Sequence, residues 1–185
     1  MSFASEDQTW IDELQLFLEP RIGELRDPDG RSYQLWNFSD AKRGTAPGDE
    51  FPEIVAEKMW RCRAAVIVLS RDYVRSQYCR YIELPFLMWR WEHHNLMCLP
   101  MKVGTVPIDK IKVPPYEGSS RSVILDDIID ERQAAASFAT SQYRDRNLKE
   151  LKEAKLEAEI EKRLDGVGRR VVEFLRRRYG ARDED

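Results

Sequence analysis

The chain has 185 residues, 42% of them hydrophobic, which is enough to bury one good core. Its 30 basic and 33 acidic residues give a net charge of -3, which excludes a global basic surface for nucleic acid. No run of 18 apolar residues and no signal peptide is present, so we expect a cytoplasmic protein without a membrane span. Its three cysteines have no metal-ligand spacing and are expected to be reduced thiols: Cys62, Cys79 and Cys98.

The first third of the chain predicts alternating strands and helices. Residues 1–4 predict the end of a first strand, whose earlier part would then lie upstream of Met1. A helix with an apolar stripe from Trp10 to Leu18 follows. Residues 33–38 predict a second strand, and residues 39–48, with two glycines and a proline, predict a loop.

The middle of the chain continues the alternation. A helix is predicted from near Asp49, a wholly apolar strand over 65–69, a helical segment over 71–92 with a kink or break at Pro85, and a strand over 95–103. A strand without polar residues is typical of a central parallel strand that is buried on both faces. The pattern therefore predicts a parallel sheet with helices on both sides.

The last part of the chain changes in character. A proline- and glycine-rich loop over 104–122 precedes a short strand at 123–125 and a helix over 126–136. From about Arg144 the chain is charged and helical, with an interruption predicted at Gly166 and Gly168. We therefore expect two regions: an α/β domain over 1–143, and over 144–185 a charged helical C-terminal extension or connection to a partner.

An acidic residue follows the apolar strand among apolar neighbours. Glu83 stands between Ile82 and Leu84, shortly after the end of the strand at 65–69. Ligand sites in open α/β sheets lie just past the carboxyl ends of such strands. Glu83 is thus either a functional side chain or a partly buried carboxylate that is paired with Arg80, one helical turn earlier.

Several blocks of the sequence together resemble one family. MSFASED followed by Trp10, LWNFSDAKRGTAPGDEF, RAAVIVLSRDYVRSQYC and Glu83-Leu84 occur in the order and spacing of a TIR domain (Toll/interleukin-1 receptor homology), of the kind common in bacterial immune effectors. The resemblance covers roughly residues 1–104. Many enzymes of this family have Trp before the cysteine and Glu three residues after it; here Tyr78 takes the place of the Trp, and Glu83 follows Cys79 by four residues.

The resemblance implies a flavodoxin-like parallel sheet flanked by helices and an NAD⁺ nucleosidase activity that cleaves the nicotinamide–ribose bond. NAD⁺ would be the substrate, with no cofactor and no metal. Breaking this bond builds positive charge on the ribose, which a nearby carboxylate stabilises. Glu83 is the candidate catalytic residue. The nicotinamide ring of NAD⁺ is positively charged and leaves as a neutral molecule, so no general acid is required.

Eight further residues are candidates for binding the substrate. Asp40 could hydrogen-bond a ribose hydroxyl, and the side chains of Lys42 and Arg43 could bind the pyrophosphate, because cations suit its charge. The other candidates lie near the ends of expected strands or in the block Ser76-Gln77-Tyr78-Cys79. Phe3 and Trp36 as plain core aromatics, and the loop as a solvated surface, remain open alternatives. The eight are Phe3, Ser5, Trp36, Asp40, Lys42, Arg43, Tyr78 and Cys79.

The resemblance also implies partners. The loop after the second strand contacts neighbouring TIR domains in the family, so we expect self-assembly to activate the enzyme, with a regulatory or sensor domain or subunit, in a prokaryotic-type immune system. The alternative is a non-catalytic TIR scaffold that acts through TIR–TIR contacts. The basic stretch RRVVEFLRRRYGAR is diluted by acidic neighbours, so we predict no membrane and no direct nucleic acid contact.

Overall fold

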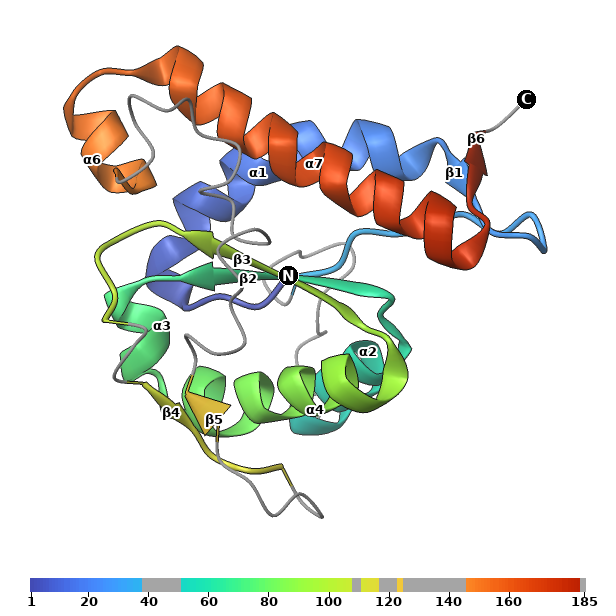
Figure 1. Cartoon of the computed structure of the whole chain (residues 1–185), viewed down its shortest axis with the longest axis horizontal. Helices are drawn as coiled ribbons and strands as arrows, with labels where there is room; N and C mark the ends of the chain where they lie inside the picture. The colour runs from blue at the N-terminus through green and yellow to red at the C-terminus, as the bar shows by residue number, and fades with distance from the viewer. Residues whose placement is uncertain (38–50, 108–110, 117–122, 125–145, 184–185) are drawn as a thin grey trace.

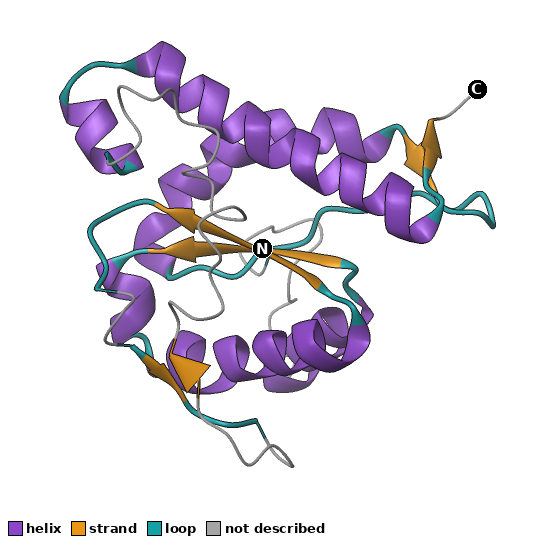
Figure 2. Cartoon of the chain, viewed as in Figure 1, coloured by secondary structure: helices purple, strands orange, loops and turns teal. Residues whose placement is uncertain are grey.

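The computed structural model describes residues 1–37, 51–107, 111–116, 123–124 and 146–183. In these residues helices lie on both sides of two parallel strands, in three layers (Figures 1 and 2). The strands are β2 (Ala64–Leu69) and β3 (Met97–Lys102), and they pair along their whole length, from Ala64 opposite Met97 to Leu69 opposite Lys102. Both strands were predicted, and both are buried, as the apolar sequence of β2 indicates.

The expected first strand is reduced to a single point of pairing. The N–H of Ser2 donates to the carbonyl of Val66, and the carbonyl of Ser2 accepts from the N–H of Val68, both at 2.9 Å. These bonds form one isolated parallel bridge between Ser2 and Ile67. The N-terminal residues therefore run alongside β2 without forming a ladder with it.

The predicted second strand is wrong for its described part, residues 33–37, which contain no strand. The segment still lies beside the N-terminus, because the ammonium group of Met1 donates to the carbonyl of Trp36 at 2.7 Å. A ladder needs a neighbouring strand of several residues. Here a cavity, described below, separates most of this segment from β2, which accounts for the missing pairing.

One face of β2–β3 is covered by the first and last helices (Figure 1). The one-turn helix η1 (Ser5–Asp7) leads into α1 (Gln8–Gly23), which packs along α7 (Glu157–Tyr179), with the short α6 (Leu148–Glu153) at one end. Strand residues Val66 and Val68 join this core. The main helix residues in it are Ile11, Leu14, Leu18, Ile160, Leu164, Val167, Val171 and Leu175.

The C-terminal helix is continuous, so the interruption predicted at Gly166 and Gly168 is wrong. A Cβ atom at Gly168 would stand 3.3 Å from the carbonyl oxygen of Phe17 on α1. This glycine therefore lets two helices approach closely and does not end one. Beyond the helices, β1 (Leu25–Arg26) and β6 (Arg182–Asp183) pair antiparallel and tie the end of α7 to the end of α1.

The other face of the sheet is covered by α2 (Phe51–Arg61), α3 (Arg71–Arg75) and α4 (Leu84–His94) (Figure 1). The alternate residues of β2, Ala65, Ile67 and Leu69, face this second core. Two short strands, β4 (Lys112–Val113) and β5 (Val123–Ile124), pair antiparallel beside it. The strand at 123 was predicted; β4 lies in a region predicted to be a loop. The loop predicted at 39–48 and the helix at 126–136 lie outside the described residues.

The predicted helical segment over 71–92 breaks at Ser76 and not at Pro85. Ser76 has an extended backbone, and its hydroxyl accepts from the N–H of Cys79 at 3.2 Å. A turn of π-helix, η2 (Cys79–Glu83), then runs directly into α4. Pro85 lies in the first turn of α4, where the missing N–H of a proline costs no intrahelical hydrogen bond. The π-turn ends on Glu83, which makes it the element that places this side chain.

Candidate functional site

Glu83 is a buried carboxylate, with 5% of its surface exposed. Its Oε2 accepts a hydrogen bond from the hydroxyl of Ser2 at 2.6 Å. The same hydroxyl lies 2.9 Å from the hydroxyl of Tyr73. A serine hydroxyl has one hydrogen, so Tyr73 donates to Ser2 when Ser2 donates to Glu83. The three side chains form a buried chain that ends on the carboxylate.

Cys79 is the second partner of Glu83. Its thiol donates to the carbonyl oxygen of Phe3 at 3.5 Å, and it lies close enough to the carboxylate to favour the charged form of Glu83. Burial, together with the neighbouring Glu83, raises the pKa of Cys79 to about 12. The thiol is therefore protonated at neutral pH and acts as a hydrogen-bond donor, not as a nucleophile.

The electrostatics of Glu83 are dominated by its burial, which raises its pKa above the usual 4.5. The hydrogen bond from Ser2, the ammonium group of Met1 and the thiol of Cys79 oppose that shift. No ion pair joins Glu83 to Arg80, although both are described; the guanidinium of Arg80 lies 5.1 Å from the centre of the Tyr81 ring instead. The carboxylate thus accepts a hydrogen bond from the neutral hydroxyl of Ser2 and is also influenced by the charge of the Met1 ammonium group.

One cavity brings together five of the nine residues proposed from the sequence. We call this cavity, with a volume of about 460 Å³, the Tyr78 cavity. It is of the size usual for small-molecule sites. Its other described lining residues include Glu6, Asp72, Arg75 and Ser76. The five are Phe3, Ser5, Tyr78, Cys79 and Glu83.

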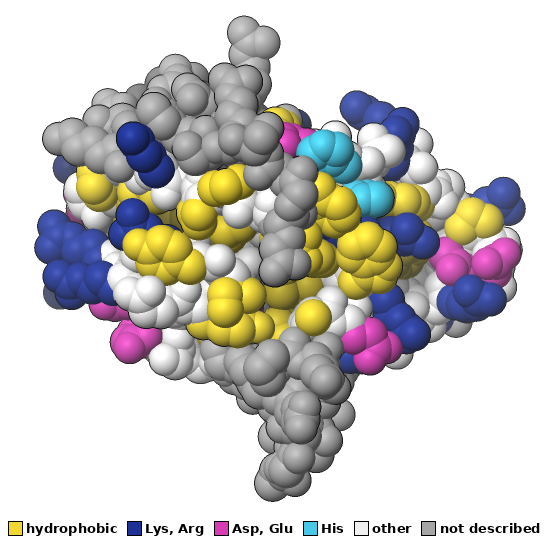
Figure 3. Space-filling view, turned by 90° about the horizontal axis from the view of Figure 1, so that it is seen from below, with side chains coloured by type: hydrophobic (Ala, Val, Ile, Leu, Met, Phe, Trp, Pro, Cys, Tyr) yellow, Lys and Arg dark blue, Asp and Glu magenta, His cyan; other side chains and the backbone are white. Residues whose placement is uncertain are grey.

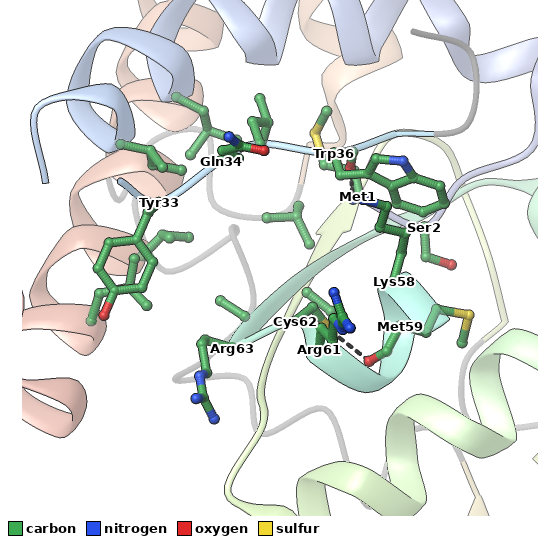
Figure 4. A pocket seen from close by; sticks show the side chains of 18 of the residues that line it. Met1, Ser2, Tyr33, Gln34, Trp36, Lys58, Met59, Arg61, Cys62 and Arg63 are labelled. Carbon is green, nitrogen blue, oxygen red and sulfur yellow. Dashed lines mark hydrogen bonds between the residues drawn. The ribbon is translucent and has the colours of Figure 1, made fainter. Parts of the chain in front are cut away.

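A second cavity of about 670 Å³ lies behind Glu83, and we call it the Met1 cavity (Figure 4). It is bounded by Met1, by residues 32–36 and by the first half of β2. Trp36, proposed to bind substrate, lines this cavity and not the Tyr78 cavity. Glu83 lines both, so the carboxylate stands between two spaces. Asp40, Lys42 and Arg43 lie outside the described residues.

The sequence interpretation missed three residues of the site. Ser2 and Tyr73 hold Glu83, and Arg75 brings a positive charge to the Tyr78 cavity. Ser2 carries a weak signal, since it is a polar residue inside an expected strand. Tyr73 lies in the block RAAVIVLSRDYVRSQYC, one of those that carry the resemblance, three residues after Ser70. Arg75 carries no signal beyond its place on a short helix.

A second buried carboxylate lies close to the site. Asp7 is 1% exposed, and its Oδ2 accepts from the hydroxyl of Ser70, which in turn accepts from the N–H of Tyr73 at 3.0 Å. Its Oδ1 has no hydrogen-bond partner among the described residues. Burial raises the pKa of Asp7. Ser70 thereby links the start of α1 to the start of α3, which carries Tyr73 and Arg75.

The described residues contain no group of three or more His, Cys, Asp or Glu side chains placed to hold a metal ion. In the same residues no helix has the length and apolar character needed to cross a membrane. Comparison of the chain with protein-family models, curated proteins and solved structures gave no match.

Proposed function

We propose that this protein is an NAD⁺ nucleosidase of the TIR type, with Glu83 as its catalytic residue. The observation that carries the proposal is the Tyr78 cavity, in which a buried carboxylate that accepts a hydrogen bond from the hydroxyl of Ser2 meets four other residues proposed from the sequence. Burial of Glu83 is costly to the fold, because desolvation of the carboxylate outweighs its hydrogen bonds and the nearby Met1 ammonium group, and this cost favours a functional role for it.

The chemistry proposed for Glu83 is electrostatic. The bond between the ribose C1′ and the nicotinamide nitrogen breaks, and its electron pair leaves with nicotinamide, which becomes neutral. The ribose is left with oxocarbenium character, which the Glu83 carboxylate stabilises. Water adds to C1′ and releases a proton, so NAD⁺ and water give ADP-ribose, nicotinamide and H⁺. The low polarity of the site strengthens the attraction between the carboxylate and the developing cation.

The lining of the Tyr78 cavity suits the remaining parts of a dinucleotide. Tyr78 offers an aromatic face, and its pKa, raised to about 12 by burial, keeps the ring neutral at physiological pH. Arg75 is exposed and supplies a positive charge for the pyrophosphate. Asp72 and Glu6 offer acceptors for hydroxyl groups. We propose Arg75 in addition to Lys42 and Arg43.

The proposal includes a flavodoxin-like sheet. The bonds from Ser2 to Val66 and from Met1 to Trp36 support an order in which the N-terminal segment lies between residues 33–37 and β2, followed by β3. In a doubly wound sheet of this order, ligands bind where the chain order reverses, next to the first segment. Ser2, Phe3 and Ser5 come from that segment.

A non-catalytic TIR scaffold is the second candidate, and exposed apolar side chains favour it. Trp60, Tyr81 and Ile82 are 52%, 47% and 54% exposed. Figure 3 shows hydrophobic side chains gathered on the face below the sheet in Figure 1. Such a surface suits contact with other copies. An enzyme that consumes NAD⁺ only in the assembled state, as effector of an immune system, would need the same surface.

The experiment that separates the two candidates is nicotinamide release from NAD⁺, measured over a range of protein concentrations. Wild type is compared with Glu83→Ala and with Glu92→Gln, an exposed control on α4. The enzyme proposal predicts release by wild type and the control, steeper than linear in protein concentration, and none by Glu83→Ala. Self-association without nicotinamide release from any of the three proteins would contradict the enzyme proposal and favour the non-catalytic scaffold.

A further inference from the structure

The lining of the Tyr78 cavity changes from buried to exposed. We call the buried part of the lining the floor and the exposed part the mouth. At the floor, Phe3 is fully buried and Glu83 is 5% exposed. At the mouth, Glu6 and Arg75 are exposed and Asp72 is half-buried. The cavity therefore leads from charged groups in solvent to the carboxylate of Glu83.

The floor suits the nicotinamide ring and its ribose. Burial and the nearby charge of Glu83 raise the pKa of Tyr78 to about 12, so the Tyr78 side chain lies within electrostatic reach of the carboxylate. A planar ring such as nicotinamide packs well against an aromatic face. The bond that breaks joins the ring to the ribose, so both must lie at the floor when Glu83 acts.

The mouth offers one cation, which suits one phosphate. Arg75 is the sole Lys or Arg side chain in the described lining, and it makes no ion pair with another described residue. A guanidinium group can bind two phosphate oxygens at once. The phosphate nearest to the cleaved bond is the one on the 5′ carbon of the nicotinamide ribose, so it meets Arg75 first. The carboxylates of Glu6 and Asp72 in the same lining repel a second phosphate.

The size of the cavity fits the same part of the substrate. Its volume of about 460 Å³ lies toward the lower end of the range for small-molecule sites, which is about 300–1,000 Å³. NAD⁺ consists of two nucleotide units joined through their phosphates. The cavity therefore has the size for one nucleotide unit, and the adenosine half of NAD⁺ would lie outside it.

We propose that the Tyr78 cavity recognises the nicotinamide ribose 5′-phosphate unit and not the adenosine half, so that nicotinamide mononucleotide is a substrate as well as NAD⁺. This substrate class presupposes the proposed nucleosidase activity and names what it acts on. The mononucleotide and water give ribose 5-phosphate, nicotinamide and H⁺, with the same bond broken at C1′. Arg75 binds the 5′-phosphate and is the residue that distinguishes substrates with this phosphate from those without it.

The test compares nicotinamide release from NAD⁺, nicotinamide mononucleotide and nicotinamide riboside, which lacks the phosphate. The proteins are wild type, Arg75→Gln and Arg71→Gln, an exposed control on the same helix outside the cavity. For wild type, we expect kcat/KM of the mononucleotide within about tenfold of that of NAD⁺, and that of the riboside at least about tenfold below the mononucleotide. Arg75→Gln should lower kcat/KM at least about tenfold for both phosphate-bearing substrates and leave the riboside unchanged. Arg71→Gln should match wild type.

A larger gap between NAD⁺ and the mononucleotide would show that the adenosine half is recognised, and would overturn the proposal while leaving the nucleosidase in place. So would an equal loss with all three substrates in Arg75→Gln, because Arg75 would then act on the fold and not on the phosphate. Absence of release from every substrate would contradict the nucleosidase itself, and with it this substrate class. The two failures are thus told apart.

Discussion

The hydroxyl of Ser2 donates to Oε2 of Glu83 at 2.6 Å, although 81 residues separate them in the chain. This bond joins the N-terminal segment to the π-turn before α4. Because Ser2 is also the residue that bridges to β2, the position of the carboxylate is set by the sheet itself. The proposed catalytic group is thus fixed by backbone pairing, through a single intervening side chain.

The first prediction concerns Ser2→Ala. The serine lowers the pKa of Glu83 by donating to its charged form, so the variant raises this pKa further. We expect the acidic limb of the pH profile of nicotinamide release to move up by about one pH unit. Tyr73→Phe, which removes the donor behind Ser2, should move it less, in the same direction. An unchanged limb in Ser2→Ala would contradict the proposed link.

The second prediction concerns stability and pH. A carboxyl group whose pKa is raised on folding binds more protons in the native state, so stability falls as pH rises from about 4.5 through the folded pKa. Glu83→Gln removes this loss. The free energy of unfolding of the variant minus that of wild type should therefore grow from acidic to neutral pH.

Urea unfolding at several pH values measures this difference. The lowered pKa of the Met1 ammonium makes stability rise with pH toward 8.0 in both proteins; because the Glu83 charge opposes that lowering in wild type alone, this contribution changes the difference in the same direction. A difference that does not change with pH would show that the carboxyl group has an ordinary pKa.

The third prediction concerns the thiols. Burial raises the pKa of Cys79 to about 12 and raises the pKa of Cys98 as well. Neither forms thiolate at neutral pH, so iodoacetamide should leave both unmodified in the native protein and label both in urea. Mass spectrometry of the labelled peptides gives the result. Rapid labelling of native Cys79 would refute its description as a buried, protonated thiol beside Glu83.

The fourth prediction concerns Ser70→Ala. The substitution removes the N-cap of α3 and the donor to the buried carboxylate of Asp7. We expect a loss of about 2–4 kcal/mol in the free energy of unfolding, since both a cap and a buried partner disappear. Ser5→Ala, on the exposed side of the same junction, should cost less than about 0.5 kcal/mol. Similar losses in the free energy of unfolding for the two variants would contradict the stabilising role assigned to Ser70.

The two paired central strands, β2 and β3, and most of the described helices follow from local pattern. β2 was predictable because a strand buried on both faces admits no polar residue. The break at Ser76 was not, because the π-turn that lets Pro85 start a helix has no local sequence signature. The role of Gly168 was not predictable either. A glycine weakens an isolated helix, and only the nearby backbone of α1 shows that this one allows close packing.

The site divides in the same way. Glu83 was predictable, because a carboxylate among apolar residues after a strand is costly without a role. Its partners were harder to predict, since Ser2 and Tyr73 meet it only through tertiary structure. Trp36 shows that position along the chain does not suffice to place a side chain: it lies near the end of an expected strand, yet it lines the cavity on the other side of Glu83.

The most direct test of the central claim is the rate of nicotinamide release at saturating NAD⁺ by Glu83→Gln relative to wild type, with circular dichroism to establish that both proteins are folded. Glutamine keeps the size of the side chain and removes the charge that stabilises the ribose cation. We predict a fall of about 10²- to 10³-fold. Equal rates from the two folded proteins would contradict the account.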